Sequence, residues 1–406
     1  MEKLRILYIS REEIPASHGG AVHTWEVARN MARLGHSITV LCHRLHHQNP
    51  FEILEGVKII RCPMSIKGKK VPLLGMVRFH HIRNIRADII MERFDTFGGL
   101  GAILSRLLGI PLLLEVNYPH LEEMVWKWRE RKPWIARQRW LIHLLGSWNR
   151  WQFKRSQANV APLKTIVPEF AVSRTHLVHW GADFTEFNPR NRLDPRCTEL
   201  LRSYNLEGKT IIIFVGSFKP WHGALDLPAI ISETLKKTTK RVYFVLVGDG
   251  EVWSTVKQSI VTQGLFEQCL FLGQRPHSEV ASWLALADIA IAPYNANYYH
   301  PMKQFGFFWS PAKIFEYMAT GLPVVAADYF PLNRIIRDGF NGKNVTPGDI
   351  PQYGTTIAQL VEDPDKGRQM GTRARRLAKS KYGWIHHTLD LERIIFDVVS
   401  DRASIN

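Results

Sequence analysis

The sequence predicts an α/β protein made of two Rossmann-like, doubly wound domains that face a central cleft. Three observations support this fold class. The 406 residues are enough for two domains of ordinary size. Short apolar runs alternate with helical patterns, as they do in parallel sheets covered by helices on both faces. The same pattern restarts after about residue 190, so we expect each half of the chain to form its own sheet.

In the first half, short apolar runs predict buried strands and the segments between several of them predict helices. We expect strands over residues 4–9, 37–42, 57–61, 88–91 and 111–116, and a helix over residues 21–34. The apolar stretch 97–114 is the nearest approach to a membrane span, but it contains Arg106, Pro111 and several glycines. A short helix followed by a buried strand explains it better than a bilayer helix.

The second half repeats this alternation. We expect strands over residues 210–215, 242–247, 269–272, 289–292 and 323–326, and helices over residues 223–236, 252–261, 278–286 and 311–318. From about residue 364 the chain is mostly helical.

The expected domains are residues 1–190 and 191–380, with a C-terminal helix at 381–406 that packs back on the first domain. Pro189 and Pro195 interrupt a charged stretch and mark the boundary. Because ligands bind at the carboxyl ends of the strands in such sheets, the expected site is the cleft between the two domains.

Positive charge is concentrated in the first half of the chain. The formal net charge is +16, and residues 1–190 carry 28 Lys and Arg against 16 Asp and Glu, a net of +12. This excess predicts an anionic partner, which can be phospholipid head groups, a phosphorylated substrate or nucleic acid.

Composition excludes several classes of protein. Apolar residues make up 45% of the chain and charged residues 22%, as in globular proteins with sizeable cores. That excludes a disordered chain, a collagen and a disulfide-stapled miniprotein. Four cysteines with no C-x-x-C pair make a zinc site or a disulfide framework unexpected. With no signal-peptide pattern at the start, we expect a cytoplasmic protein.

A glycine pair opens the first predicted helix. His18-Gly19-Gly20 lies between a strand and that helix, where backbone N–H groups and the helix dipole can approach a phosphate. A plain tight turn is an equally good interpretation. The chain contains no G-x-G-x-x-G and no Walker loop.

Two further loops follow predicted strands in the second half. The loop at residues 215–223 contains Ser217, Lys219 and His222, and its basic side chains can meet a diphosphate at the start of the next helix. A solvated loop is the alternative. Gly248 and Gly250 follow the next strand, and for these glycines a turn conformation is the expected role.

The segment 310–326 carries the most specific pattern. A polar loop at Ser310 leads into a helix in which Lys313 and Glu316 are three residues apart and share one face. Gly321 ends the helix and a strand follows directly. A carboxylate placed there can accept both hydroxyls of a ribose while Lys313 and the helix start neutralise phosphate. The alternative is a surface Lys–Glu pair.

Taken together, these segments resemble the family 4 glycosyltransferases of the GT-B fold, a retaining group that uses nucleotide sugars. The resemblance covers nearly the whole chain. It is carried by Gly19-Gly20 with residues 22–36, Glu115-Val116-Asn117-Tyr118-Pro119, Gly181-Ala182-Asp183 with Phe187-Asn188-Pro189, residues 215–223, Ala287-Asp288 with Ala292-Pro293, and residues 310–326.

The resemblance implies that the first domain is the acceptor side and the second holds the donor. Glu316 corresponds to the second glutamate of the family's E-x7-E motif, which binds the donor ribose, and Lys313 to a lysine near the donor phosphates. Gly20 corresponds to a glycine that approaches the transferred sugar or its phosphate. Gln274 and Arg275 correspond to the loop beside the nucleobase.

Three positions depart from the family pattern. Phe308 stands where the first glutamate of E-x7-E is expected, which puts the donor sugar and the activity itself in question. Ser217 replaces the usual arginine and His222 the usual lysine, and Lys219 and Lys313 are expected to supply the missing positive charge.

The predicted site is therefore as follows. The expected donor-binding residues are Gly19, Gly20, Ser217, Lys219, His222, Gly248, Gln274, Arg275, Ser310 and Glu316. The expected catalytic residues are Glu316, Lys313 and His120. His120 lies near where many family members keep an acceptor-side histidine, and a surface histidine at a helix start is an equally good interpretation of it.

The resemblance implies a metal-independent, retaining glycosyltransferase that moves a sugar from a nucleotide-sugar donor to a lipid-linked or polysaccharide acceptor in glycan biosynthesis. The leaving nucleoside diphosphate would be stabilised by lysines and helix N-termini. No other cofactor is expected. The alternatives are a non-catalytic GT-B subunit that binds glycan or a partner enzyme, and a GT-B sugar-nucleotide epimerase.

A basic, tryptophan-rich segment lies at residues 126–155. It holds six tryptophans and nine Lys and Arg against one acid. Trp140, Trp148 and Trp151 recur at helical spacing, so we expect one stripe that contacts an anionic membrane surface at the inner, cytoplasmic face. A domain core or an acceptor groove is the alternative. Nucleic-acid binding is not expected, because no recognition module is present.

Overall fold

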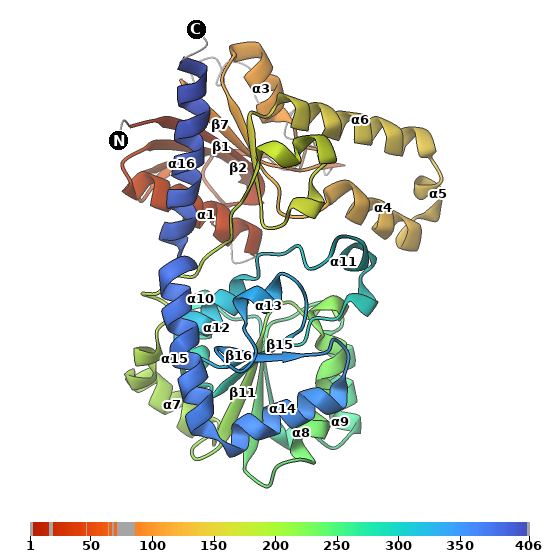
Figure 1. Ribbon diagram of the computed structural model, residues 1–406, viewed down its shortest axis with the longest axis vertical. Coiled ribbons are helices and arrows are strands. Elements are labelled where there is room, and N and C mark those ends of the chain that lie inside the picture. Colours follow the sequence, from red (N-terminus) through yellow and green to blue (C-terminus); the bar gives the residue numbers. More distant parts are fainter. Residues whose placement is uncertain are drawn as a thin grey trace. The chain divides into compact units, whose positions relative to one another are not determined.

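The computed structural model describes residues 3–15, 19–45, 47–63, 65–66, 69–70 and 86–403. These form two compact units (Figure 1). Unit 1 comprises residues 1–180, 308–310 and the C-terminal segment from Trp384, and unit 2 comprises residues 181–307 and 311–383.

The division between the units differs from the expected boundary near residue 190. The chain enters unit 2 at Gly181. The physical reason is local packing. The Ala182 N–H donates to the Tyr382 carbonyl over 2.9 Å, and Phe187 is fully buried. Arg375 also donates to the Phe187 carbonyl over 3.2 Å. Residues 181–190 therefore pack with unit 2.

Unit 1 contains an eight-stranded sheet in the order β10-β9-β8-β7-β1-β2-β4-β3. All neighbouring strands are parallel except β3 with β4. The strands are β1 (Arg5–Glu13), β2 (Ser37–Arg44), β3 (Phe51–Leu54), β4 (Val57–Pro63), β7 (Ile89–Arg93), β8 (Leu112–Glu115), β9 (Ala158–Ala161) and β10 (Thr175–Leu177). The five strands predicted for this half are all present as members of this sheet. A separate two-stranded sheet pairs β5 (Ser65–Ile66) with β6 (Lys69–Lys70).

Helices cover this sheet because its central strands are buried on both faces. The helices of unit 1 are α1 (Gly19–Arg33), α3 (Leu100–Leu108), α4 (His120–Arg131), α5 (Pro133–Ala136), α6 (Arg139–Arg155) and α16 (Trp384–Ala403). Of these, α5 contacts α4 and buries no residue. The predicted short helix and strand within residues 97–114 are α3 and β8. Helix α16 packs beside α1 (Figure 1) and inserts Leu391, Ile394 and Ile395 into the core that contains Tyr8.

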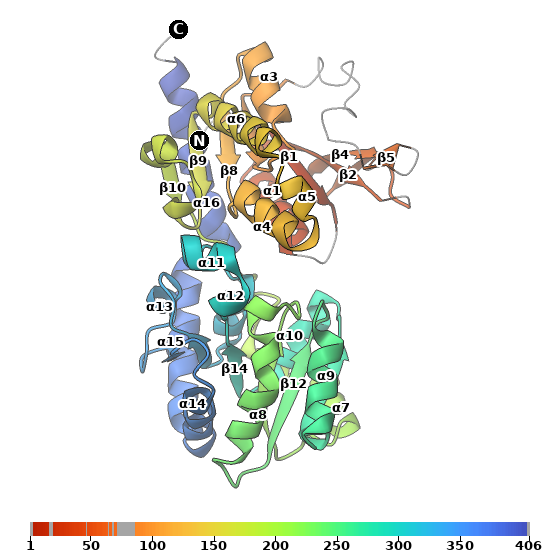
Figure 2. The same ribbon diagram turned by 90° about the vertical axis from the view of Figure 1, so that its right-hand side faces the viewer.

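Unit 2 contains a six-stranded parallel sheet in the order β13-β12-β11-β14-β15-β16 (Figure 2). The strands are β11 (Thr210–Val215), β12 (Val242–Val247), β13 (Cys269–Gly273), β14 (Ile289–Ala292), β15 (Val324–Ala327) and β16 (Gly342–Val345). The order runs outward from β11 in both directions, so the sheet has a switch point between β11 and β14, where ligands bind in doubly wound sheets.

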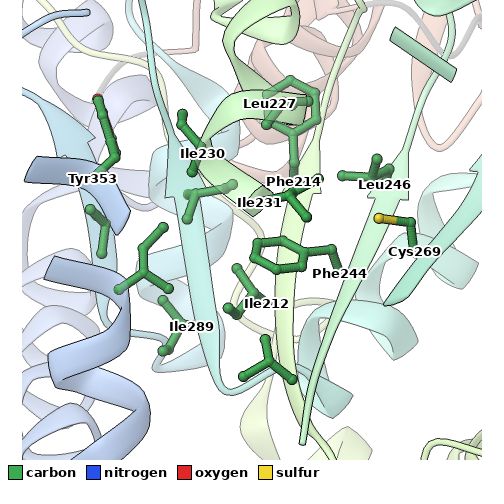
Figure 3. Close-up of a cluster of buried hydrophobic side chains, with 14 of the residues drawn as sticks. Ile212, Phe214, Leu227, Ile230, Ile231, Phe244, Leu246, Cys269, Ile289 and Tyr353 are labelled. Carbon is green, nitrogen blue, oxygen red and sulfur yellow. The ribbon is translucent and has the colours of Figure 1, made fainter. Parts of the chain in front are cut away.

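The helices of unit 2 lie on both faces of this sheet. They are α7 (Pro195–Ser203), α8 (Leu227–Leu235), α9 (Trp253–Thr262), α10 (His277–Leu286), α11 (His300–Phe305), α12 (Ala312–Thr320), α13 (Leu332–Ile335), α14 (Ile350–Glu362) and α15 (Pro364–Lys381). Figure 3 shows the core between sheet and helices, where Ile212 and Phe244 from the strands meet Ile230 from α8 and Tyr353 from α14.

Two predicted features need adjustment. The helix expected over residues 223–236 begins as α8 only at Leu227, because Gly223 has a left-handed φ of 78° and short 3-10 turns at Pro220–His222 and Ala224–Asp226 precede it. The C-terminal helical region also begins earlier than residue 364, with α14. No helix in the described ranges has the length and apolar character needed to cross a bilayer.

Candidate functional site

Glycine loops at the carboxyl ends of β11 and β12 bring two backbones together. A Cβ on Gly248 would lie 2.1 Å from the Gly216 carbonyl oxygen, which is far too close, so this approach requires glycine. A Cβ on Gly216 would lie 2.9 Å from Nζ of Lys313. The loop after β11 therefore leaves space for the Lys313 side chain beside its backbone. Gly248, predicted as a donor-loop or turn residue, has this packing role.

Lys313, at the start of α12, presents an unsatisfied buried ammonium. Its Nζ is buried and makes no hydrogen bond within the described residues, and it lies 4.6 Å from the centroid of the Phe214 ring and 5.0 Å from that of Tyr294. Burial lowers the pKa of Lys313 to about 7, although Glu316 opposes this. Keeping a buried amine protonated without a hydrogen-bond partner is costly, so this position is suited to an anionic ligand that would pair with the charged form.

Glu316 lies one turn after Lys313 on α12 and is 9% exposed. Its Oε1 lies 3.1 Å from Nε2 of His277, and Nδ1 of the same histidine lies 3.2 Å from Oε2 of Glu186. Burial acts to lower the pKa of His277, but its bonds to the two carboxylates outweigh burial and raise the pKa to about 10. Glu316 is therefore a held carboxylate rather than a free surface group.

Sequence reasoning identified Glu316 and Lys313 but missed His277 and Glu186. His277 comes two residues after Arg275 in the predicted nucleobase loop, and that proximity was the available signal. Its pairing with Glu186 joins residues 91 apart in the chain, which no local pattern encodes.

His222, in the loop after β11, is neutral. Its Nδ1 lies 2.9 Å from the Ser217 carbonyl. Burial first, then the charges of Lys313 and Lys219, lower its pKa well below the usual value. His222 therefore cannot replace the positive charge of the family's lysine. Nζ of Lys219 lies 5.2 Å from the centroid of the Trp221 ring. Lys219 is exposed, whereas Nζ of Lys313 is buried.

The remaining predicted residues of the donor loops are placed as follows. Gln274 and Arg275 follow β13 directly, and Nε of Arg275 lies 3.6 Å from Glu279 on α10. The Ser310 hydroxyl oxygen accepts the Trp180 N–H over 2.6 Å, and both residues belong to unit 1. This bond anchors residues 308–310 to unit 1.

Phe308 is part of the core. It is fully buried and its ring centroid lies 4.5 Å from that of Trp309. An ionised glutamate in such surroundings would be strongly destabilised, so the apolar residue fits its environment.

The glycine pair at the start of α1 lies against two side chains, Glu12 and Trp180. A Cβ on Gly20 would lie 2.1 Å from Oε1 of Glu12, and a Cβ on Gly19 would lie 3.8 Å from the Trp180 ring. The Glu12 carboxylate occupies the space beside the Gly20 Cα, and the role of Gly20 toward a sugar or phosphate stays a prediction. His18, the third member of the predicted motif, lies outside the described residues.

The Glu115-Val116-Asn117 motif forms a buried polar network within unit 1. Glu115 accepts from the Tyr8 hydroxyl over 2.6 Å and from the Asn117 amide over 2.7 Å. Arg93 NH1 lies 3.5 Å from the same carboxylate and donates to His23 over 2.7 Å. Burial, and then the Arg93 charge, lower the pKa of His23 well below its usual value. These bonds join β1, α1, β7 and the end of β8.

His120 is held at the first turn of α4. Its Nδ1 lies 3.6 Å from Oδ2 of Asp95, and its ring stacks on Tyr118 with centroids 3.6 Å apart. Arg11 donates to the other Asp95 oxygen over 2.5 Å. Burial lowers the pKa of His120 to about 4, with Asp95 opposing the shift. The imidazole is therefore neutral at pH 7.

The predicted tryptophan stripe does not form one exposed surface. Trp148 donates to the Gly98 carbonyl over 3.2 Å and stacks on Trp151 with centroids 4.9 Å apart. Three apolar side chains are exposed: Trp140 at 65%, Trp134 at 67% and Leu144 at 59%. The C-terminal half of α6 packs on the loop before α3, so only its N-terminal half and α5 expose apolar side chains.

Comparisons with known proteins agree with this architecture. The family model for glycosyl transferases group 1 matches residues 198–377, and the model for Glycosyltransferase Family 4 matches residues 17–186. The chain is 24% identical over 292 residues to the α-D-kanosaminyltransferase of Streptomyces kanamyceticus, covering 69% of each protein. It spans about half the length of several other curated relatives that it matches.

Solved structures share the fold over nearly the whole chain. The sucrose-phosphate synthase of Thermosynechococcus elongatus superimposes with a TM-score of 0.75 at 15% identity, covering 98% of this chain and 100% of that one. HepE of Anabaena, solved in complex with UDP and glucose, superimposes with a TM-score of 0.70 at 17% identity, covering 96% and 98%.

Proposed function

Because the chain belongs to the family 4 glycosyltransferases of the GT-B fold, we propose that it is a retaining glycosyltransferase that uses a nucleotide-sugar donor. The acceptor would be a lipid-linked or polysaccharide hydroxyl in glycan biosynthesis. The related HepE structure was solved with UDP and glucose, which supports a donor of this class.

The observation that carries the proposal is the buried Nζ of Lys313 beside Gly216, which has no hydrogen-bond partner in the described residues. A diphosphate bound at the end of β11 would pair with this charge and accept from backbone N–H groups at the start of α12. Glu316, three residues on, would accept from ribose hydroxyls. The three groups together match a nucleoside diphosphate better than an uncharged ligand.

The proposed reaction follows from this charge arrangement. The bond between the anomeric carbon and the donor phosphate oxygen breaks, and a bond to the acceptor oxygen forms on the same face of the sugar. The acceptor proton passes to the departing phosphate oxygen. Lys313 and the start of α12 would stabilise the negative charge that develops on the diphosphate, so the transfer needs no metal for that purpose. His120 is the candidate residue on the acceptor side.

The test is nucleotide release from UDP-, GDP- and ADP-sugars, with and without a lipid extract, for wild type, Glu316→Gln and Glu207→Gln. We expect release from one donor, lost in Glu316→Gln and kept in Glu207→Gln, a matched change at a surface glutamate whose side chain is 64% exposed. A dependence on the extract would indicate a lipid-borne acceptor.

The buried Phe308, at the position of the first motif glutamate, favours a second candidate, a non-catalytic GT-B subunit. Nucleotide binding without release from any donor, with or without acceptor material, would favour this second candidate. A changed sugar nucleotide in the absence of acceptor would instead indicate an epimerase.

We also propose that the enzyme works at the cytoplasmic face of a membrane. Trp134, Trp140 and Leu144 are exposed, and the basic side chains around them can attract anionic lipid. The exposed neighbours are Arg131, Lys132, Arg137 and Arg139.

Flotation with phosphatidylglycerol and phosphatidylcholine vesicles tests this surface. We expect anionic vesicles to carry the protein and the double variant Trp134→Ala, Trp140→Ala to bind less. Phe266→Ala, at a 45% exposed side chain of unit 2, is the control. Equal flotation of all three proteins would exclude this surface as the lipid contact.

A further inference from the structure

His277 occupies a position between two carboxylates that come from distant parts of unit 2. It is the first residue of α10. Nε2 faces Glu316 on α12 at 3.1 Å, and Nδ1 faces Glu186 at 3.2 Å. The ring is also set edge-on to Phe187 with centroids 4.9 Å apart, so its orientation is restrained from two sides.

The chemistry of the three side chains determines the direction of the bonds. Ionised carboxylates only accept hydrogen bonds, so both ring nitrogens donate and the imidazole is protonated. The bond from His277 goes to Oε1 of Glu316, so this bond does not use the second oxygen, Oε2. Oε2 keeps its lone pairs to accept from an incoming hydroxyl donor.

We propose that His277 is a positioning residue for donor binding, and that it holds the Glu316 carboxylate with one oxygen open to the donor's ribose hydroxyls. Glu186 holds the opposite side of the ring and keeps it charged. This inference rests on the donor site proposed above and adds to it the residue pair that orients its carboxylate.

Two consequences separate this role from simple packing. Loss of His277 should weaken donor binding more than it slows turnover, because the ribose contact is made equally in the ground and transition states. Loss of Glu186 should add a further pH dependence of donor binding to that of the wild type, since the histidine would then lose its proton at a lower pH. The charged groups facing His277 are Glu186 and Glu316, with Lys313 acting on Glu316.

The experiment measures the Kd of UDP, GDP and ADP by titration calorimetry for wild type, His277→Asn, Glu186→Gln and Glu316→Gln. We expect His277→Asn to raise the Kd on the order of tenfold at pH 7, with kcat changed less, which is the size of one charge-assisted hydrogen bond. His277→Lys, which restores one cationic donor, should recover part of the affinity. His176→Asn, at an exposed histidine of unit 1, is the control.

The pH series provides a test that does not depend on the folding of the histidine variant. The ratio of the Glu186→Gln Kd to the wild-type Kd should grow between pH 7 and pH 9.5. Unchanged binding in His277→Asn and a flat ratio, with binding lost in Glu316→Gln, would overturn the positioning role and leave the donor site intact. No nucleotide binding in any protein, wild type included, would overturn the proposed function itself.

Discussion

At the scale of single residues, Lys313 shows how a local cost can indicate a ligand. Its Nζ is buried against two aromatic rings without a hydrogen-bond partner in the described residues. Burying an amine without a hydrogen-bond partner opposes folding, whereas an apolar side chain here would carry no such cost. Burial lowers the pKa of Lys313 to about 7, and under the proposed function the charge that favours the protonated form arrives with the donor diphosphate.

The pKa of Lys313 predicts how nucleotide affinity depends on pH. Free Lys313 titrates near pH 7, and a bound phosphate would raise its pKa by pairing with the ammonium. Binding then takes up a proton above pH 7, and affinity falls by at most about tenfold per pH unit as pH rises. Calorimetry in buffers of different ionisation enthalpy at pH 8 measures this uptake.

The control for that prediction is Lys313→Met, which removes the titrating group and keeps an apolar stem over the rings. Its affinity should be lower at pH 7 and independent of pH between 7 and 9. A wild-type affinity that is equally flat would contradict the assignment of Lys313 to the phosphates.

At the scale of elements, tight contacts between loops determine the structure at the carboxyl ends of the central strands in unit 2. Gly223, between two 3-10 turns, has φ 78°, and a Cβ there would lie 1.7 Å from the Pro293 carbonyl oxygen. The loop after β11 thus lies directly against the loop after β14, on the two sides of the switch point. This contact positions Trp221 and His222 at the site.

Gly223→Ala should cost roughly 3 kcal/mol or more, since both the backbone conformation and the contact with Pro293 are lost. Gly264 is a matched control, with φ 70° and no atom within 4 Å of a built Cβ. Gly264→Ala should cost about 1 kcal/mol, from the left-handed backbone alone. Denaturant unfolding of both variants measures the difference, and equal losses would show that the Pro293 contact is unimportant.

At the scale of the whole molecule, the C-terminal helix completes a domain begun at the N-terminus. Leu391 of α16 is fully buried in a core with Tyr8 and Ile38. Nε2 of His387, on the same helix, lies 3.3 Å from Nε2 of His23 of α1. Unit 1 is therefore assembled from segments that are more than two hundred residues apart in the chain. Unit 2 has a separate core of its own.

Leu391→Ala should destabilise unit 1 by about 2–5 kcal/mol, the range for a large-to-small change in a core. Hydrogen exchange should speed up in β1 and α1 and stay unchanged in β11 and α12. Leu389→Ala, at a 45% exposed leucine of the same helix, should change neither the stability of unit 1 nor its hydrogen exchange. Faster exchange across both units would contradict the assignment of α16 to the core of unit 1 alone.

Much of the fold was predictable because its signals are local. β11, β12 and β14 have the predicted bounds, since central parallel strands are buried on both faces and read as uninterrupted apolar runs. Short or less apolar strands such as β9, β10 and β16 were not predicted, because four residues or fewer of mixed character carry little periodicity.

The candidate site was predictable only where its residues lie close together in the sequence. Lys313 and Glu316 were found because both lie on one helical turn. The occupant of the space over Gly20 was not, because Glu12 comes from the preceding strand and its direction depends on the fold. The tryptophan stripe had the right helical spacing, but packing on Gly98 decided which of its members are exposed.

The sequence by itself determined the two-sheet α/β architecture, the glycine loops and the Lys313–Glu316 pair, because each depends on residues within one strand, turn or helix. Only the tertiary structure decided that His277 joins Glu186 to Glu316, that α16 belongs to the core of unit 1, and that Glu12 covers Gly20. The physical reason is that pairings between distant segments depend on strand order and helix packing, and these are set by burial over a whole unit rather than by any local pattern.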